Sequence, residues 1–151
     1  MKKSILIAVL MIALTAASCG RKNTENDLLA VNKKNKTEVV QEKYSGTLPA
    51  ADGPGIVYEV TLLHYDGKDS GIYHMRNTYI EGENGRDVAF DEYGDFIVTR
   101  RSADRILRLT PFNENQDVTS FIKDGDASIT LLDAQMNRIQ SNLNYTLKSV
   151  K

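Results

Sequence analysis

The sequence predicts an all-β domain: a small antiparallel up-and-down barrel, closed or partly open, of about eight strands. From Tyr44 onward, short runs rich in Val, Ile, Leu, Tyr, Phe and Thr are separated by Gly, Asp and Asn, which is typical of an antiparallel meander. No segment there keeps a 3.6-residue apolar period over three turns. About 108 of the 151 residues follow Lys43, which suits one domain. Sequential antiparallel strands remove their exposed edges by closing into a barrel.

The N-terminus carries the pattern of a bacterial lipoprotein signal. Lys2 and Lys3 precede the apolar run Ile5–Leu14, and three small residues lead to Cys19. The run is shorter than the roughly 20 residues that a membrane-spanning helix needs, so we predict a cleaved signal peptide over residues 1–18. Small residues directly before a cysteine form a lipobox, in which the thiol is acylated. Cys19 is therefore the predicted lipid attachment site and membrane anchor.

Residues 19–43 are predicted to be the lipid anchor followed by a flexible tether. They are polar, carry charges of both signs and contain no aromatic residue, a composition that does not build a core. Cys19 is the only cysteine of the chain. No disulfide within the chain is expected, and acylation would use the only thiol.

The charge balance excludes some partners. The predicted signal peptide holds two of the 19 Lys and Arg residues and none of the 20 Asp and Glu residues, so the mature chain has a net charge of −3. This balance argues against nucleic-acid binding and against a basic membrane-binding face. The body, residues 44–151, is expected to be monomeric.

The first predicted strands follow from turn residues and alternation. Tyr44–Ile56 is expected to be a strand followed by a tight loop, because prolines and glycines crowd its second half and exclude a helix. Ile56–Tyr65 alternates between two faces. Asp66–Ser70 then forms a hairpin loop, and Gly71–Glu81 is the return strand.

The remaining strands are expected after a second turn at Gly82–Gly85. Asp87–Phe90 and Phe96–Arg100 flank an expected turn around Tyr93 and Gly94. The strands that complete the barrel are Arg105–Thr110, Val118–Lys123, Ser128–Leu132 and Leu143–Val150.

Motifs for catalysis are not found: the sequence has no Gly-x-Ser-x-Gly, no His-Glu-x-x-His and no phosphate-binding glycine loop, so we expect no enzyme. A metal site is the sharper hypothesis. His64 and His74 flank the first hairpin loop, and facing positions would bring their imidazoles together. Met75 would join them only through a bulge. Imidazole and thioether suit copper, and imidazole also suits zinc. The alternative is two polar residues near the hairpin, with Met75 in the core.

Two stretches carry a resemblance to a known family. The first is YSGTLPAADGPGI at Tyr44–Ile56; the second runs from Leu132-Asp133 through Ile139 to Asn144-Tyr145-Thr146-Leu147. Together they resemble the N-terminal domain of the NlpE copper-resistance lipoproteins, over roughly residues 44–148. The family commonly has a Cys-x-x-Cys pair in the proline-glycine loop, where this chain has Ala50 and Gly53. Longer members continue into a second, OB-like domain, whereas this chain ends at Lys151, so we expect a single-domain form.

The resemblance implies a lipocalin-like barrel in a non-enzymatic envelope lipoprotein associated with copper resistance and the envelope stress response. Gly20, and not Asp, follows Cys19, which favours the outer membrane, with the domain facing the periplasm and an envelope protein as a partner. An alternative is a lipocalin-like binder of a small apolar ligand, held among inward-facing aromatic side chains. A third possibility is a structural homologue that contacts lipoprotein-trafficking or cell-surface partners.

Overall fold

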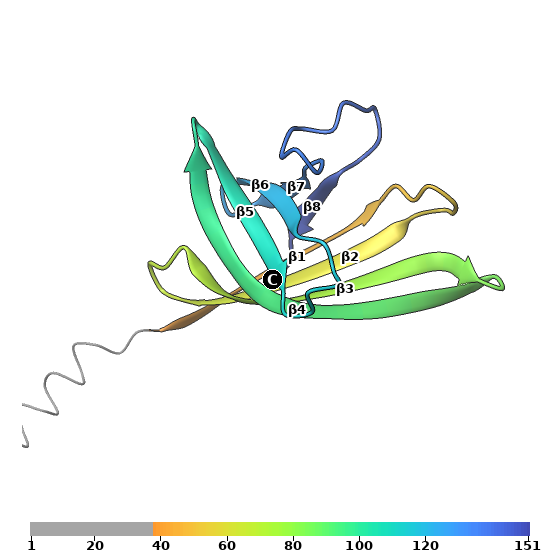
Figure 1. The fold of residues 1–151 in the computed structure, drawn as a ribbon, viewed down its shortest axis with the longest axis horizontal. Coiled ribbons are helices and arrows are strands. Elements are labelled where there is room, and N and C mark those ends of the chain that lie inside the picture. Colours follow the sequence, from red (N-terminus) through yellow and green to blue (C-terminus); the bar gives the residue numbers. More distant parts are fainter. Residues whose placement is uncertain (1–37) are drawn as a thin grey trace, which may run out of the picture. The chain divides into compact units, whose positions relative to one another are not determined.

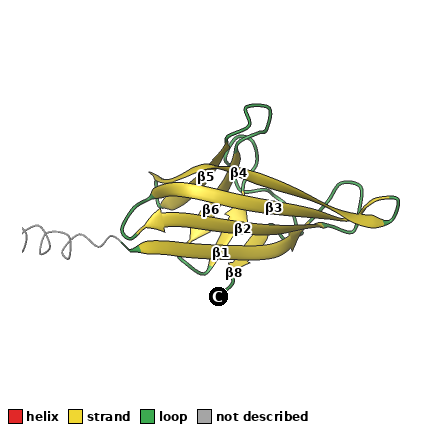
Figure 2. Cartoon of the chain, turned by 90° about the horizontal axis from the view of Figure 1, so that it is seen from below, coloured by secondary structure: helices red, strands yellow, loops and turns green. Residues whose placement is uncertain are grey.

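A computed structural model describes residues 38–151, in which eight antiparallel strands close into one barrel (Figure 1). The strands are β1 (Val39–Leu48), β2 (Ile56–Tyr65), β3 (Ser70–Glu83), β4 (Arg86–Arg101), β5 (Asp104–Pro111), β6 (Thr119–Asp124), β7 (Ser128–Leu131) and β8 (Thr146–Ser149). Each strand pairs with its neighbours in chain order, and β8 returns to β1 (Figure 2). The predicted up-and-down barrel is confirmed, and it is closed. No helix in this part of the chain is long and apolar enough to cross a membrane.

The first strand begins earlier than the sequence predicted. The signal peptide, Cys19 and the tether as far as residue 37 lie outside the described residues, but residues 39–43 form the first half of β1, where a tether was expected. This half of β1 pairs with β2 from Val39 opposite Tyr65 to Lys43 opposite Thr61. This half of β1 is polar because its alternate residues face solvent and because Glu42, which faces inward, forms polar contacts at one end of the barrel. The domain boundary therefore lies before Val39.

Strand β4 is continuous where a turn was expected around Tyr93 and Gly94. Gly94 lies opposite Tyr73 of β3 and Pro111 of β5, and a Cβ atom there would lie 2.0 Å from the carbonyl oxygen of Thr110. The glycine thus permits a close approach of backbones inside a strand. Figure 1 shows β4 bending strongly across the barrel. The prediction was wrong because a glycine at a strand bend has the same local sequence as one at a turn.

The barrel interior is filled by one cluster of buried hydrophobic side chains. Every strand contributes to it, and its members are Tyr44, Leu48, Val60, Leu62, Tyr73, Met75, Phe96, Leu107, Leu109, Phe121, Ile129 and Leu147. Such close packing supplies most of the stability of a small domain. It also opposes the alternative of an apolar-ligand carrier, because the positions that would line such a cavity pack against one another.

Candidate functional site

A lysine points into the barrel near one of its ends. Lys123 lies on β6 two residues after Phe121, so both side chains face the interior. Only 2% of the Lys123 side chain is exposed. A buried ammonium group is costly unless it is paired and hydrogen-bonded, and three side chains provide this pairing.

The partners of Lys123 come from β1 and from the turn after β6. Its Nζ donates hydrogen bonds to Oε2 of Glu42 and, over 2.9 Å, to the hydroxyl of Tyr44. The Tyr44 hydroxyl itself donates to Oε2 of Glu42. Asp126 adds a carboxylate oxygen 3.6 Å from Nζ, and Nζ also lies 5.4 Å from the centroid of the Tyr44 ring, within cation–π range.

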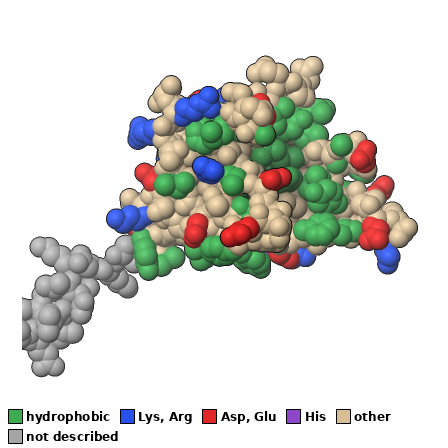
Figure 3. All heavy atoms as spheres, viewed as in Figure 1, with side chains coloured by type: hydrophobic (Ala, Val, Ile, Leu, Met, Phe, Trp, Pro, Cys, Tyr) green, Lys and Arg blue, Asp and Glu red, His purple; other side chains and the backbone are tan. Residues whose placement is uncertain are grey.

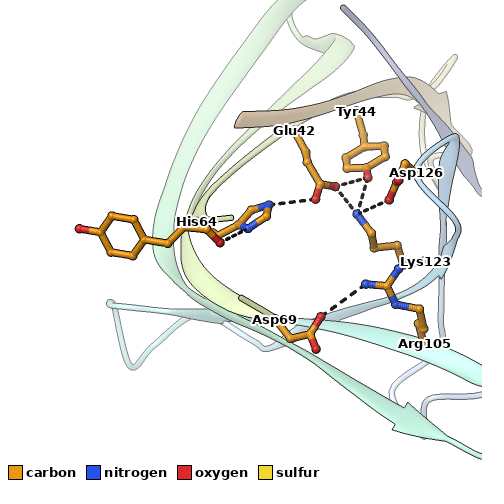
Figure 4. Close-up of polar contacts among 8 residues, drawn as sticks. Glu42, Tyr44, His64, Asp69, Arg105, Lys123 and Asp126 are labelled. Atoms are coloured by element: carbon orange, nitrogen blue, oxygen red, sulfur yellow. Dashed lines mark hydrogen bonds and ion pairs between the residues drawn. The ribbon is translucent and has the colours of Figure 1, made fainter. Parts of the chain in front are cut away.

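His64 completes this cluster from β2. Its Nε2 lies 3.1 Å from Oε1 of Glu42, and its Nδ1 lies 2.9 Å from the carbonyl oxygen of Tyr65. Both ring nitrogens therefore face acceptor oxygens. The imidazole edge meets the ring of Phe96 at a centroid distance of 6.0 Å. Figure 4 shows the side chains of Glu42, Tyr44, His64 and Lys123 turned toward one another.

The cluster shifts the pKa values of two of its members. Burial by itself raises the pKa of Glu42, but hydrogen bonds from Lys123, Tyr44 and His64 and the charge of Lys123 together bring the pKa below its usual value. Burial, and then the adjacent Glu42 carboxylate, raises the pKa of the Tyr44 phenol well above its usual value. Glu42 is thus held as a carboxylate, and Tyr44 as a neutral donor.

A cavity of about 560 Å³ opens at this end of the barrel, above the cluster. Arg105 of β5 reaches inward to Asp69 of the β2–β3 turn, with Nη2 3.4 Å from Oδ1 (Figure 4). We call this end the polar mouth; it comprises Glu42, His64, Asp69, Arg105 and Asp126. Its acids and bases are paired with one another, so it offers fixed hydrogen-bonding groups of both signs, suited to a polar or zwitterionic group and not to an apolar one.

The two histidines of the predicted metal site do not lie together. His64 is paired with Gly71, and His74 with Thr61, so the two histidines are three positions apart in register. An odd offset places side chains on opposite faces of a sheet: His64 faces the interior and His74 the outside. We expected facing positions from the sequence, and the hairpin register corrects this expectation.

Outside the barrel, His74 contacts Asp91 and Tyr93 of β4. Its Nε2 lies 2.7 Å from Oδ1 of Asp91, and its ring stacks on that of Tyr93 with centroids 4.5 Å apart. Met75 faces inward and is buried in the core, as regular alternation predicts. Among residues 38–151, no group of three or more His, Cys, Asp and Glu side chains is arranged to hold a metal ion.

Ala50 and Gly53 lie in the loop between β1 and β2, at the positions where the resemblance implies a cysteine pair in other members of the family. The loop borders a groove of about 350 Å³ that is completed by Leu143 and Asn144. The side-chain amide of Asn144 donates to the carbonyl oxygen of Thr47 over 3.2 Å, and this bond ties the groove together. Neither Ala nor Gly has a side-chain donor atom, so the loop contributes shape to this groove and no ligands.

The polar mouth was not predicted from the sequence. Glu42 was assigned to the tether, and Lys123 and Arg105 were treated as ordinary strand residues. One signal was present: Lys123 has the same strand parity as Phe121, so it is a charged residue at a core-facing position. Such a residue requires an opposite charge from elsewhere in the chain, although alternation alone does not say which one.

Comparisons with known proteins agree with the resemblance seen in the sequence. The family model described as the NlpE N-terminal domain matches residues 44–142. The chain is also similar to Lipoprotein NlpE of Escherichia coli (strain K12), with 26% identity over 151 residues that cover 99% of this chain. The chain spans 58% of the length of that relative. No solved structure matches the chain.

Proposed function

Because this chain belongs to the family of the NlpE N-terminal domain, we propose that it is an envelope lipoprotein whose barrel acts as a non-enzymatic recognition module in the envelope stress response. The observation that carries the proposal is the position of the family match: it begins within β1 and covers the barrel through β7. The polar mouth is the surface proposed for recognition, since the rest of the interior is occupied by the core.

Anchoring is the first part of the proposal. The similarity to a protein named Lipoprotein NlpE supports acylation of Cys19 after removal of residues 1–18. Gly20 after the cysteine favours an outer-membrane location, with the barrel facing the periplasm. The partner would be another envelope protein, since the net charge of the mature chain disfavours nucleic acid.

Recognition suits the polar mouth better than catalysis does. A general base needs a free lone pair and a pKa near the working pH. Glu42 is poorly suited to this role: Lys123, Tyr44 and His64 take three of the four lone-pair positions of its oxygens, and these contacts lower its pKa. The groups are arranged to hold a fixed charge pattern, and such a pattern contributes specificity to binding.

We propose that copper is a stress to which the protein responds, and that the hairpin histidines do not bind it. His64 and His74 lie on opposite faces of the sheet, and Ala50 and Gly53 lack donor atoms. A titration of Cu(I), Cu(II) and Zn(II) against the chain from Gly20 to Lys151 should give the same result for wild type, His64→Ala and His74→Ala. Tight binding lost in both variants would contradict this part of the proposal.

The proposal is tested in the host bacterium with an envelope-stress reporter. Cells that overproduce wild-type protein should activate the reporter. Cys19→Ala should abolish activation by removing the anchor, and Arg105→Ala should reduce it by opening the ion pair with Asp69. Arg86→Ala, an exposed arginine at the far end of the β3–β4 hairpin, is the matched control and should leave activation unchanged. Full activation by Arg105→Ala at equal protein level would remove the polar mouth from the proposal.

A further inference from the structure

We propose that an apolar patch on the outer face of strands β1–β4 docks on the lipid bilayer in which the chain is anchored. This inference rests on the proposed anchoring through Cys19 and adds a second contact with the membrane. The outer apolar patch consists of Val39, Leu63, Tyr65, Ile72 and Ile97.

The strand register makes these side chains neighbours. Tyr65 is paired with Val39, and Ile72 with Leu63; Ile97 is paired with Ser70, two residues from Ile72. All have the outward strand parity, opposite to that of His64. Tyr65 is 56% exposed and Ile72 is 51% exposed. With strands about 4.8 Å apart, four strands give a patch about 14 Å wide.

The patch is shallowly hollowed and has a polar border. Val39, Leu63, Tyr65 and Ile72 line a groove of about 340 Å³. In the next two outward rows along the same strands, the side chains are charged or polar apart from the aromatic Tyr93: Lys43, Thr61, His74 and Tyr93, then Ser45, Glu59, Arg76 and Asp91. In Figure 3, apolar side chains follow the lower edge of the view from the end where β1 begins. Exposed apolar surface rimmed by polar residues marks an interaction site.

The position of the patch in the chain selects the bilayer as its occupant. Val39, the first residue of β1, is itself part of the patch and follows Cys19 by 20 residues. Twenty residues span at most about 70 Å, so an acylated Cys19 keeps the patch continuously within reach of the membrane. A tether of this length gives a local concentration on the order of 1 mM, so even a weak apolar contact is populated. A soluble partner has no such advantage.

The composition of the patch suits the interfacial region. Tyr65 has an apolar ring with a polar tip, and tyrosine favours the boundary between headgroups and acyl chains. Gln41 and Asp95 lie in the same row as Leu63 and Ile72, so the contact stays at the surface and does not extend into the hydrocarbon. In this contact, the part of the acyl chains closest to the headgroups would surround the side chains of Leu63, Tyr65 and Ile72.

The absence of tryptophan in the chain allows a direct test. The full chain carrying Tyr65→Trp is produced with its anchor and reconstituted into vesicles of phosphatidylethanolamine and phosphatidylglycerol. Brominated phosphatidylcholine is then added as a quencher. Phe90→Trp is the matched control, because Phe90 is as exposed as Tyr65, at 57%, but lies away from the patch. Its pairing partner on β3 is Asn77, five residues along the strand from Ile72. The emission of the Tyr65→Trp protein should fall about twofold, and that of the Phe90→Trp protein should stay nearly constant.

Each outcome decides the inference. Adding Ile72→Glu to Tyr65→Trp should restore the lost emission without changing the circular dichroism spectrum. The mass of the N-terminal peptide verifies that the protein is acylated. If the acylated Tyr65→Trp protein shows no quenching, the docking is overturned and the anchoring stays intact. Equal quenching of the Tyr65→Trp and Phe90→Trp proteins would also overturn the docking. A blue shift of the Tyr65→Trp emission that depends on the density of protein on the vesicles, but not on bromine, would overturn it too, because it would indicate that a second copy of the chain covers the patch. If the N-terminal peptide carries no acyl groups, the proposed anchoring is overturned, and this inference with it.

Discussion

Glu42 is the residue on which the polar side chains inside the barrel converge. One oxygen accepts from Lys123 and Tyr44, and the other lies against His64. The buried ammonium of Lys123 and the carboxylate of Glu42 therefore depend on each other. Without Glu42, Lys123 would keep only the more distant carboxylate of Asp126, and without Lys123, Glu42 would lose the positive charge that compensates its partial burial.

Lys123→Met tests this dependence. Removing the ammonium leaves Glu42 without its closest partner, so the free energy of unfolding should fall by about 3 kcal/mol. The double variant Glu42→Gln, Lys123→Met should recover part of that loss, because no unpaired charge remains. Urea unfolding followed by circular dichroism measures both. Lys148→Met, an exposed lysine of β8, is the control and should change stability by less than about 0.5 kcal/mol.

The lowered pKa of Glu42 predicts a loss of stability in acid. The folded state holds the Glu42 proton less tightly than the unfolded state, whose pKa is about 4.3. The stabilisation is therefore complete above that pH and is lost as the pH falls through the lower pKa of the folded state. Urea unfolding between about pH 6 and pH 3 should show a steeper decline for wild type than for Glu42→Gln. Equal slopes would show that Glu42 does not contribute to the decline.

At the scale of elements, the long β3–β4 hairpin determines how the barrel closes. Its strands have 14 and 16 residues, against four for β7 and four for β8. The extra length requires β4 to bend to remain in register with both β3 and β5, and Gly94 provides the space. Closure at the other side depends on few contacts, since β8 pairs with β1 at only Tyr44–Ser149 and Ser45–Lys148.

Gly94→Ala should therefore destabilise the barrel. The added Cβ would lie 2.0 Å from the Thr110 carbonyl oxygen and 2.6 Å from the Tyr73 ring, so β5 must move away from β4, at a cost of about 2–4 kcal/mol. Gly85→Ala is the control: a Cβ atom at Gly85 would have nothing within 4 Å, and only the positive φ of 71° opposes the change, by about 1 kcal/mol. Thermal unfolding compares the two, and an equal effect would refute the close-approach explanation.

At the scale of the whole molecule, the filled interior makes the barrel a solid body with different ends and faces. Polar groups gather at one end as the polar mouth, and apolar side chains lie on the outer surface of the same strands.

The core also holds tyrosines whose phenols cannot ionise readily. Burial, and then the carboxylate hydrogen-bonded to each phenol, raises the pKa values of Tyr44 and Tyr73. For Tyr58, burial and the charges of neighbouring groups raise the pKa.

These phenols predict a loss of stability in alkali. A pKa raised by folding means that the folded state keeps protons that the unfolded state releases near pH 10. The stabilisation is present below about pH 10 and declines as the pH rises beyond it. Absorbance at the tyrosinate band should show that part of the seven tyrosines ionises only together with loss of the β-sheet circular dichroism signal. Complete ionisation in the folded state would contradict this expectation.

Much of the fold could be predicted because strand alternation and turn residues act over a few neighbouring positions. The bounds of β2 agree with the prediction, as do the pairing of β2 with β3 and the inward position of Met75. The errors also have local causes. The first half of β1 has the composition of a linker, and Gly94 has the composition of a turn, because a single chain segment does not reveal the strand that will pack against it.

The all-β class, the near-complete set of strands and the family could be predicted from the amino-acid sequence, because each depends on short patterns read in order. Which charged residues meet became clear only from the folded barrel. Glu42 and Lys123 are 81 positions apart and share no local pattern, whereas His64 and His74 are near in sequence and separated by an odd register offset. Barrel closure decided the first result, because it brings β1 and β6 to the same interior. The register of the β2–β3 hairpin decided the second, because successive residues of a strand face opposite sides of the sheet.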